Sequence, residues 1–265
     1  MNFAKLITAG VSTICGGGVI VYSVHSYNSN LLKVNASRLN NDDVHISKWD
    51  SNWDRRDPAN NSELQKATPT AVRYIFLIRH GQYNYYGERD TDRNLTKLGR
   101  EQALLTGKRL QEFAHKYKHL IVSTMTRAKE TAALIQESLP NNLKVIHCPL
   151  LEEGAPIPPE PPVDFYNPSP CEYFEDGARI EAAFRRYIHR ADPEQKGDSY
   201  EIIVCHGNVI RYFICRALQV PVDAWMRIGI HHASITGIAI LPNGRVVLST
   251  INDSGHLPVK LVTAV

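Results

Sequence analysis

From residue 74 onward, short apolar runs of strand length alternate with longer segments in which apolar residues recur every three or four positions. The expected strands are residues 74–78, 120–123 and 201–205, and the expected helices are residues 95–114, 128–139, 177–190 and 209–218. Thr96 is placed to cap the first of these helices. Alternating strands and helices predict an α/β domain with a mostly parallel sheet that helices cover on both faces. We place this domain at residues 71–265.

Two further segments of this domain have a distinctive composition. Residues 156–170 hold seven of the fifteen prolines, which predicts an extended, stiff loop. Residues 234–241 and 246–251 flank the sequence Pro242-Asn243-Gly244, which predicts a β-hairpin with Asn-Gly at its tip.

The N-terminal region has a different character. Residues 6–24 contain no charged side chain, and about 17–25 apolar residues are enough to span a bilayer. We therefore expect a membrane anchor at residues 1–25, formed by one transmembrane helix. The alternative is a cleaved secretory signal, but its basic segment would be short and no A-x-A cleavage site follows. Residues 26–70 are polar and rich in Asn, which predicts a flexible linker.

The linker contains an unusual aromatic motif, Trp-Asp-Ser-Asn-Trp-Asp at residues 49–54, with two of the three Trp of the chain. A linker has no core of its own in which to bury them. We interpret the motif as a docking element that inserts aromatic anchors into a groove of a neighbouring copy or domain and so supports self-association. The alternative is two exposed Trp side chains. The motif residues are Trp49, Asp50, Asn52, Trp53 and Asp54.

Charge and cysteine content exclude some classes of protein. The chain has 30 Lys and Arg against 27 Asp and Glu, and this balance is too even for a dedicated nucleic-acid-binding protein. The five Cys lack the spacing of metal ligands and favour a reducing compartment. We expect no nucleic-acid partner.

Polar side chains follow three of the expected strands. Arg79-His80-Gly81 follows the first strand, residues 123–127 follow the second, and His206-Gly207 follows residues 201–205. Because ligands bind at the carboxyl ends of parallel strands, we expect these segments to meet. Two guanidinium groups, from Arg79 and Arg127, suit a dianionic tetrahedral oxyanion. The pattern predicts a phosphate site, although each residue alone could be an ordinary polar residue.

Four sequence blocks, residues 77–81, 94–103, 123–128 and 205–207, together resemble the histidine phosphatase superfamily, which has the phosphoglycerate mutase fold. The resemblance covers residues 73–251. The motif at residues 49–54, the N-terminal anchor and residues 153–156 and 175–180 are similar to a mitochondrial branch of the family that dephosphorylates Ser and Thr in proteins.

This resemblance implies a role for each candidate residue. His80 would attack phosphorus and form a phosphohistidine that water then hydrolyses. Glu153 would protonate the departing alkoxide and then activate water, with Glu152 as a competing candidate. The phosphoryl oxygens would be held by Arg79, Arg127, His206 and Gly207. The resemblance implies no metal and no cofactor.

The resemblance also implies a function. The chain would be a protein serine/threonine phosphatase, with phosphohistidine as a further candidate substrate, held by residues 6–24 in a mitochondrial membrane, the outer membrane being favoured. Its partners would be phosphoprotein substrates and other copies of the chain, in a dimer or larger oligomer. The alternatives are a phosphoglycerate-type mutase or small-metabolite phosphatase, and a membrane scaffold with a vestigial site. Tyr83 and Tyr86 stand where many such mutases carry Ser or Thr and Asn, which disfavours a phosphoglycerate site.

Overall fold

The computed structural model describes residues 48–57, 68–140 and 143–264. Contacts divide the chain into two units, residues 1–48 and 49–265, and every element below belongs to the second. The expected anchor at residues 6–24 lies outside the described residues. Within the described ranges, no helix combines the length and the apolar character that a membrane crossing requires.

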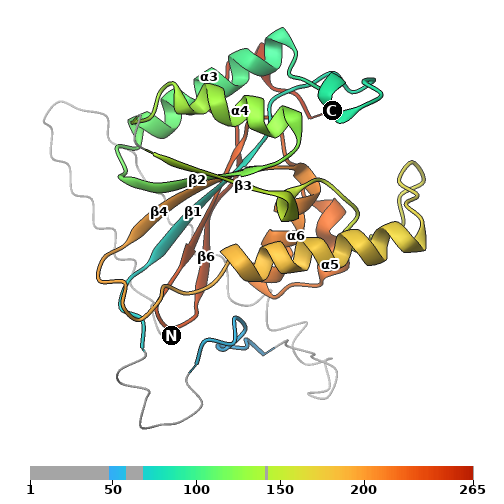
Figure 1. The fold of residues 1–265 in the computed structure, drawn as a ribbon. Helices are drawn as coiled ribbons and strands as arrows, with labels where there is room; N and C mark the ends of the chain where they lie inside the picture. Colours follow the sequence, from blue (N-terminus) through green and yellow to red (C-terminus); the bar gives the residue numbers. More distant parts are fainter. Residues whose placement is uncertain (1–47, 58–67, 141–142, 265) are drawn as a thin grey trace, which may run out of the picture. The chain divides into compact units, whose positions relative to one another are not determined.

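A six-stranded sheet forms the centre of the domain, in the order β3-β2-β4-β1-β5-β6 (Figure 1). The strands are β1 (Arg73–Arg79), β2 (Tyr117–Ser123), β3 (Lys144–Cys148), β4 (Ser199–Cys205), β5 (Ile235–Ile240) and β6 (Val246–Asp253). The first four strands pair in parallel, whereas β5 runs antiparallel to β1 and β6 antiparallel to β5. The prediction of a mostly parallel sheet and a terminal hairpin is confirmed, and β3 is an additional strand that the sequence analysis missed.

In the described part of the chain, helices cover both faces of the sheet (Figure 1). They are α3 (Lys97–Glu112), α4 (Thr126–Gln136), α5 (Pro170–Tyr187) and α6 (Gly207–Leu218). The short 3-10 helices are η1 (Asp90–Asp92), η2 (Pro149–Leu151), η3 (Val222–Arg227) and η4 (Val259–Leu261). One hydrophobic core packs α5 and α6 against the sheet and a second packs α3 and α4 against the other face. Consecutive residues of β1, Leu77 and Ile78, belong to different cores, because side chains alternate across a strand.

Local side-chain chemistry sets the helix boundaries. The Thr96 hydroxyl accepts a hydrogen bond from Gly99 N at 3.0 Å, so α3 begins where the sequence predicted. The expected start of α5 at residue 177 is wrong, because the helix begins at Pro170. Ser169 and Glu172 form a capping box there, and a proline is tolerated in the first turn because its missing N–H would have no partner. The preceding residues, 156–169, contain neither helix nor strand, as their proline density predicts.

Residues 49–57 pack on the domain of the same chain. The Trp53 ring lies 5.8 Å from the ring of Phe184, and its Nε1 donates to Gly244 O at 2.7 Å. Gly244 has a φ of +81°, and a Cβ there would lie 2.3 Å from Ser51 O, so only glycine fits both the hairpin turn and this contact.

The other residues of the aromatic motif have polar roles or exposed surface. Asp50 N donates to Gln219 Oε1 at 2.8 Å, and Asn52 Oδ1 accepts from Arg190 at 3.2 Å. Asp54 forms a buried ion pair with Arg190, whereas Trp49 is 36% exposed. Self-association through this motif stays a prediction.

Candidate active site

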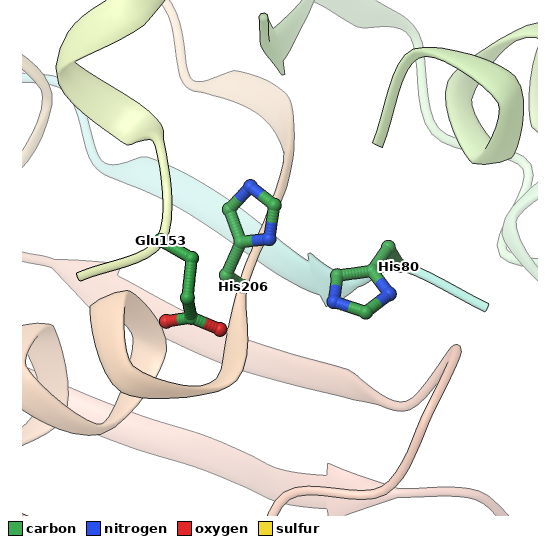
Figure 2. A group of neighbouring side chains, drawn as sticks. All are labelled: His80, Glu153 and His206. Carbon is green, nitrogen blue, oxygen red and sulfur yellow. The ribbon is translucent and has the colours of Figure 1, made fainter. Parts of the chain in front are cut away.

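The pairing of β1 with β4 brings two histidines together. These parallel strands are in register with Arg79 opposite Cys205, so the residues that follow, His80 and His206, are neighbours at the carboxyl edge of the sheet. Their ring centroids are 5.0 Å apart. Glu153 reaches the same place from the loop after η2, and Figure 2 shows the three side chains converging from separate segments.

Hydrogen bonds fix the tautomer of His80. Its Nδ1 lies 2.9 Å from the carbonyl oxygen of Gly81, and a carbonyl can only accept, so Nδ1 carries the proton. Nε2 therefore keeps its lone pair, and Arg127 Nε donates to it at 3.2 Å. Burial, followed by the charges of His206, Arg127 and Arg79, holds the pKa of His80 well below its usual range. The ring is a neutral imidazole with one nucleophilic nitrogen.

Two guanidinium groups flank this ring, from the half-buried Arg79 and the buried Arg127. Arg79 donates from Nη1 to Ile230 O at 2.6 Å and to Ala264 O at 2.7 Å, and burial lowers its pKa to about 10. Arg127 is 3% exposed and its guanidinium carbon lies 4.7 Å from the ring centre of Tyr83. Among the described residues, Arg79 Nε and Arg127 Nη1 have no hydrogen-bond acceptor although both are buried. Buried N–H donors of this kind fit the oxygens of an anion.

His206 and Gly207 lie where β4 leads into α6. His206 Nε2 is 2.7 Å from Ser123 Oγ, and its Nδ1 is buried without a partner among the described residues. Burial first, and the arginine charges second, hold the pKa of His206 well below its usual value. Gly207 is the first residue of α6, and a helix N-terminus favours negative charge.

The structure separates the two neighbouring carboxylates. An oxygen of Glu153 and ring nitrogens of His80 and His206 all lie within 4.8 Å of one another, and Glu153 Oε1 accepts from Asn208 N at 3.1 Å. The Glu152 carboxylate instead accepts a hydrogen bond from the Thr124 hydroxyl. Burial raises the pKa of Glu153, and the nearby arginine charges oppose that shift only in part. Glu153 is therefore the carboxyl group that can hold a proton inside the site.

The same three side chains have the spacing of a metal site. However, the arginine charges that lower the pKa of both histidines create a positive potential, which opposes binding of a cation. The arrangement therefore suits a tetrahedral oxyanion better than a metal ion.

Two residues of the site escaped the sequence analysis, His232 and Arg211. The ring of His232 is buried, 5.6 Å from that of His80, and its Nε2 has no partner in the described part of the chain. Arg211 is placed one turn into α6, donates to Ile228 O at 2.7 Å and interacts electrostatically with Glu153. A signal for His232 existed: β5 is antiparallel, so the residues before it lie at the edge where the parallel strands end.

Comparison with known proteins agrees with this geometry. A "Serine/threonine-protein phosphatase Pgam5, mitochondrial" from Drosophila grimshawi is 47% identical over 270 residues, which cover 94% of this chain and 93% of the relative. A protein of the same name from Xenopus laevis is 52% identical over 232 residues, covering 82% of this chain and 84% of that protein.

Among solved structures, a phosphoglycerate mutase from Plasmodium falciparum matches with a TM-score of 0.50 and 32% identity, covering 72% of this chain and 96% of the other. The sequence profile of the histidine phosphatase superfamily (branch 1) matches residues 75–155 and 159–254. The chain thus belongs to branch 1 of the histidine phosphatase superfamily.

Proposed function

We propose that this chain is a mitochondrial serine/threonine protein phosphatase that works through a phosphohistidine on His80. One observation carries the chemistry: Nε2 of a neutral, buried His80 has its lone pair beside two guanidinium groups with unused N–H donors. Relatives that are 47% and 52% identical over most of their length carry the name of such a phosphatase, which supports the substrate class and the compartment.

The first step transfers the phosphoryl group to the enzyme. His80 Nε2 attacks phosphorus, and the bond from phosphorus to the Ser or Thr oxygen breaks. The departing oxygen takes the proton of Glu153, whose raised pKa favours the protonated form before reaction. Arg79, Arg127 and His206 hold the phosphoryl oxygens while negative charge spreads over them.

The second step releases phosphate and restores the enzyme. The carboxylate of Glu153 accepts a proton from water, and the resulting hydroxide attacks the phosphohistidine. The bond from phosphorus to Nε2 breaks, which leaves His80 neutral again. The hydrogen bond from its Nδ1 to Gly81 O persists throughout and keeps the ring oriented.

The proposal extends to the location and assembly of the enzyme. Residues 6–24 carry no charge and would form a single-pass anchor. We place this anchor in a mitochondrial membrane, the outer rather than the inner one. The aromatic motif at residues 49–54 would support self-association, and phosphoproteins would be the substrates.

The test compares substrates and a matched variant. The full chain is purified in detergent and supplied with phosphoserine peptides or with 3-phosphoglycerate, and wild type is compared with His80→Asn. We expect peptide turnover that His80→Asn abolishes, and an acid-labile phosphate trapped on the wild type alone. Turnover that survives the substitution would refute the role of His80. Efficient conversion of 3-phosphoglycerate would favour a mutase, and no turnover of any substrate would favour a scaffold.

A further inference from the structure

An open cleft extends outward from the catalytic histidine. Its volume is about 890 Å³, and its inner end is formed by Arg79, Tyr83 and His232. The rings of Tyr83 and His232 lie 5.0 and 5.6 Å from that of His80, so the cleft begins next to the nucleophile. Sites of about 300–1,000 Å³ enclose drug-sized ligands. The cleft therefore has room for much more than a phosphate group.

Aromatic side chains form the outer part of the cleft. Tyr85 and Tyr86 are 65% and 91% exposed. The ring of Tyr85 lies 6.1 Å from that of Tyr83 and 5.6 Å from that of Tyr86, so the three tyrosines form one continuous surface. Exposed aromatic groups next to a catalytic centre favour a role in recognition, because they offer a large apolar area with few rotatable bonds.

The backbone at the inner end of this aromatic surface, at Tyr83 and Asn84, is held in place. Tyr83 pairs with Leu95 in an isolated β-bridge, and Asn84 N donates to Asn94 O at 2.8 Å. The Asn84 side chain also donates to Asp92 O at 3.0 Å. A platform that is fixed before binding loses little conformational entropy when a ligand arrives.

The inner end of the cleft has an unused polar group. His232 Nδ1 lies 2.9 Å from Thr263 Oγ1, whereas Nε2, on the opposite edge of the ring, is buried and has no partner among the described residues. Burial lowers the pKa of His232 to about 3, so the ring is neutral. A neutral imidazole nitrogen can bind a peptide amide or carbonyl group.

The charge of the lining limits what the cleft can accept. No Asp or Glu lines it among the described residues, and Arg79 places a positive charge at its inner end. A basic side chain would find no counter-ion there and would be repelled. An aromatic or branched aliphatic side chain would instead bury apolar area against the tyrosines.

We propose that the surface of Tyr83, Tyr85 and Tyr86 is a substrate subsite, which binds an aromatic or branched aliphatic residue next to the phosphoserine or phosphothreonine. This inference rests on the proposed function, and it explains why tyrosines occupy positions 83 and 86 of this chain. His232 Nε2 binds the peptide backbone between the phosphoryl group and that side chain.

The test uses peptides that differ only beside the phosphoserine. The flanking residue is Phe, Leu, Gly or Lys, and acetyl-phosphoserine N-methylamide serves as a substrate without any flanking side chain. Affinity is measured by equilibrium binding to the full-length His80→Asn chain, and kcat/KM with the active chain. The variants are Tyr85→Ala with Tyr86→Ala, and Phe174→Ala as a control, since Phe174 is 79% exposed and does not line the cleft.

We expect the Phe and Leu peptides to exceed the Gly and Lys peptides roughly tenfold in affinity and in kcat/KM. A ratio of this size corresponds to burial of about half of an apolar side chain. The double variant should lose this preference and keep wild-type turnover of acetyl-phosphoserine N-methylamide, whereas Phe174→Ala should change neither. Equal binding of all four peptides, or a preference that survives the double variant, would overturn the subsite. If no peptide is turned over but the Phe and Leu peptides still bind more tightly, the proposed function is contradicted and the subsite is supported.

Discussion

Replacement of Asp54 by alanine tests whether residues 49–57 are an integral part of the domain. Arg190 lies 2.5 Å from Asp54, and their side chains are only 5% and 1% exposed. Asp57 also pairs with Arg190, at 2.6 Å, but its side chain is 44% exposed. Alanine at position 54 would leave a buried guanidinium whose one remaining carboxylate partner, Asp57, is 44% exposed.

The size of the effect follows from this geometry. Removal of one partner from a buried ion pair costs about 3–5 kcal/mol, and because Asp57 remains we expect the lower limit, about 3 kcal/mol. For a domain of this size that corresponds to a fall in Tm of about 6–12 °C. The loss of stability also has an upper limit, because the variant can release residues 49–57 and let water hydrate Arg190. The loss in free energy of unfolding cannot exceed the amount that docking of this segment contributes.

Thermal unfolding of the full chain in detergent, followed by circular dichroism, measures the loss. Hydrogen exchange of residues 48–57 reports on local release of the segment. Asp50→Ala is the matched control, because Asp50 pairs with Arg55 at 3.5 Å with both side chains well exposed, and such pairs contribute about 0.2–1 kcal/mol. A shift for Asp54→Ala no larger than for Asp50→Ala would refute the reasoning. A wild-type Tm that rises with protein concentration would show that unfolding is coupled to dissociation of an oligomer.

Three further predictions concern the charges of the site. Arg127→Gln removes a positive neighbour and should raise the pKa of His80 toward its usual value, measured by NMR titration of the ring; an unchanged pKa would contradict the electrostatic explanation. Glu153→Gln should lower kcat about 10²–10⁴-fold, whereas Glu152→Gln should leave kcat nearly unchanged. Steady-state kinetics in which Glu152→Gln gave the larger loss would contradict the assignment of Glu153 as the acid. Finally, buried histidines such as His232, whose pKa of about 3 lies below that of the unfolded chain, bind fewer protons when folded. The free energy of unfolding should therefore fall as the pH drops from about 7 through 6.5 toward 4. Denaturant titrations at several pH values measure this free energy. A constant free energy of unfolding over this range would argue against the burial of a neutral His232.

The sequence contained enough information for the centre of the site. Apolar strands that end in polar residues could be aligned without knowing the strand order, because all parallel strands of a sheet end at one edge. That rule placed His80 and His206 together across the pairing of β1 with β4. It could not choose between Glu152 and Glu153, which are adjacent in a loop, because a one-residue difference decides which carboxylate points inward.

Other elements depend on long-range contacts that leave no local pattern. β3 has only five residues, and just one of them is fully buried, so its periodicity is weak. α5 begins at Pro170 because of a capping box that a proline-rich segment obscures. The docking of residues 49–57 depends on the pairing of Asp54 with Arg190, which are 136 positions apart. No local pattern predicts a contact at that separation.

The arrangement of charges explains how one site can both bind a dianion and keep its nucleophile reactive. Arg79 and Arg127 disfavour an imidazolium, so His80 retains the Nε2 lone pair that attack requires. A bound phosphate dianion offsets these charges and so raises the pKa of Glu153 further, which keeps its proton in place until the leaving oxygen needs it. Nε2 of His80 stays unprotonated, because burial and the neighbouring charges hold its pKa well below the usual range and Arg127 Nε donates a hydrogen bond to it. A bound dianion therefore keeps Glu153 protonated while His80 keeps the lone pair that attacks phosphorus.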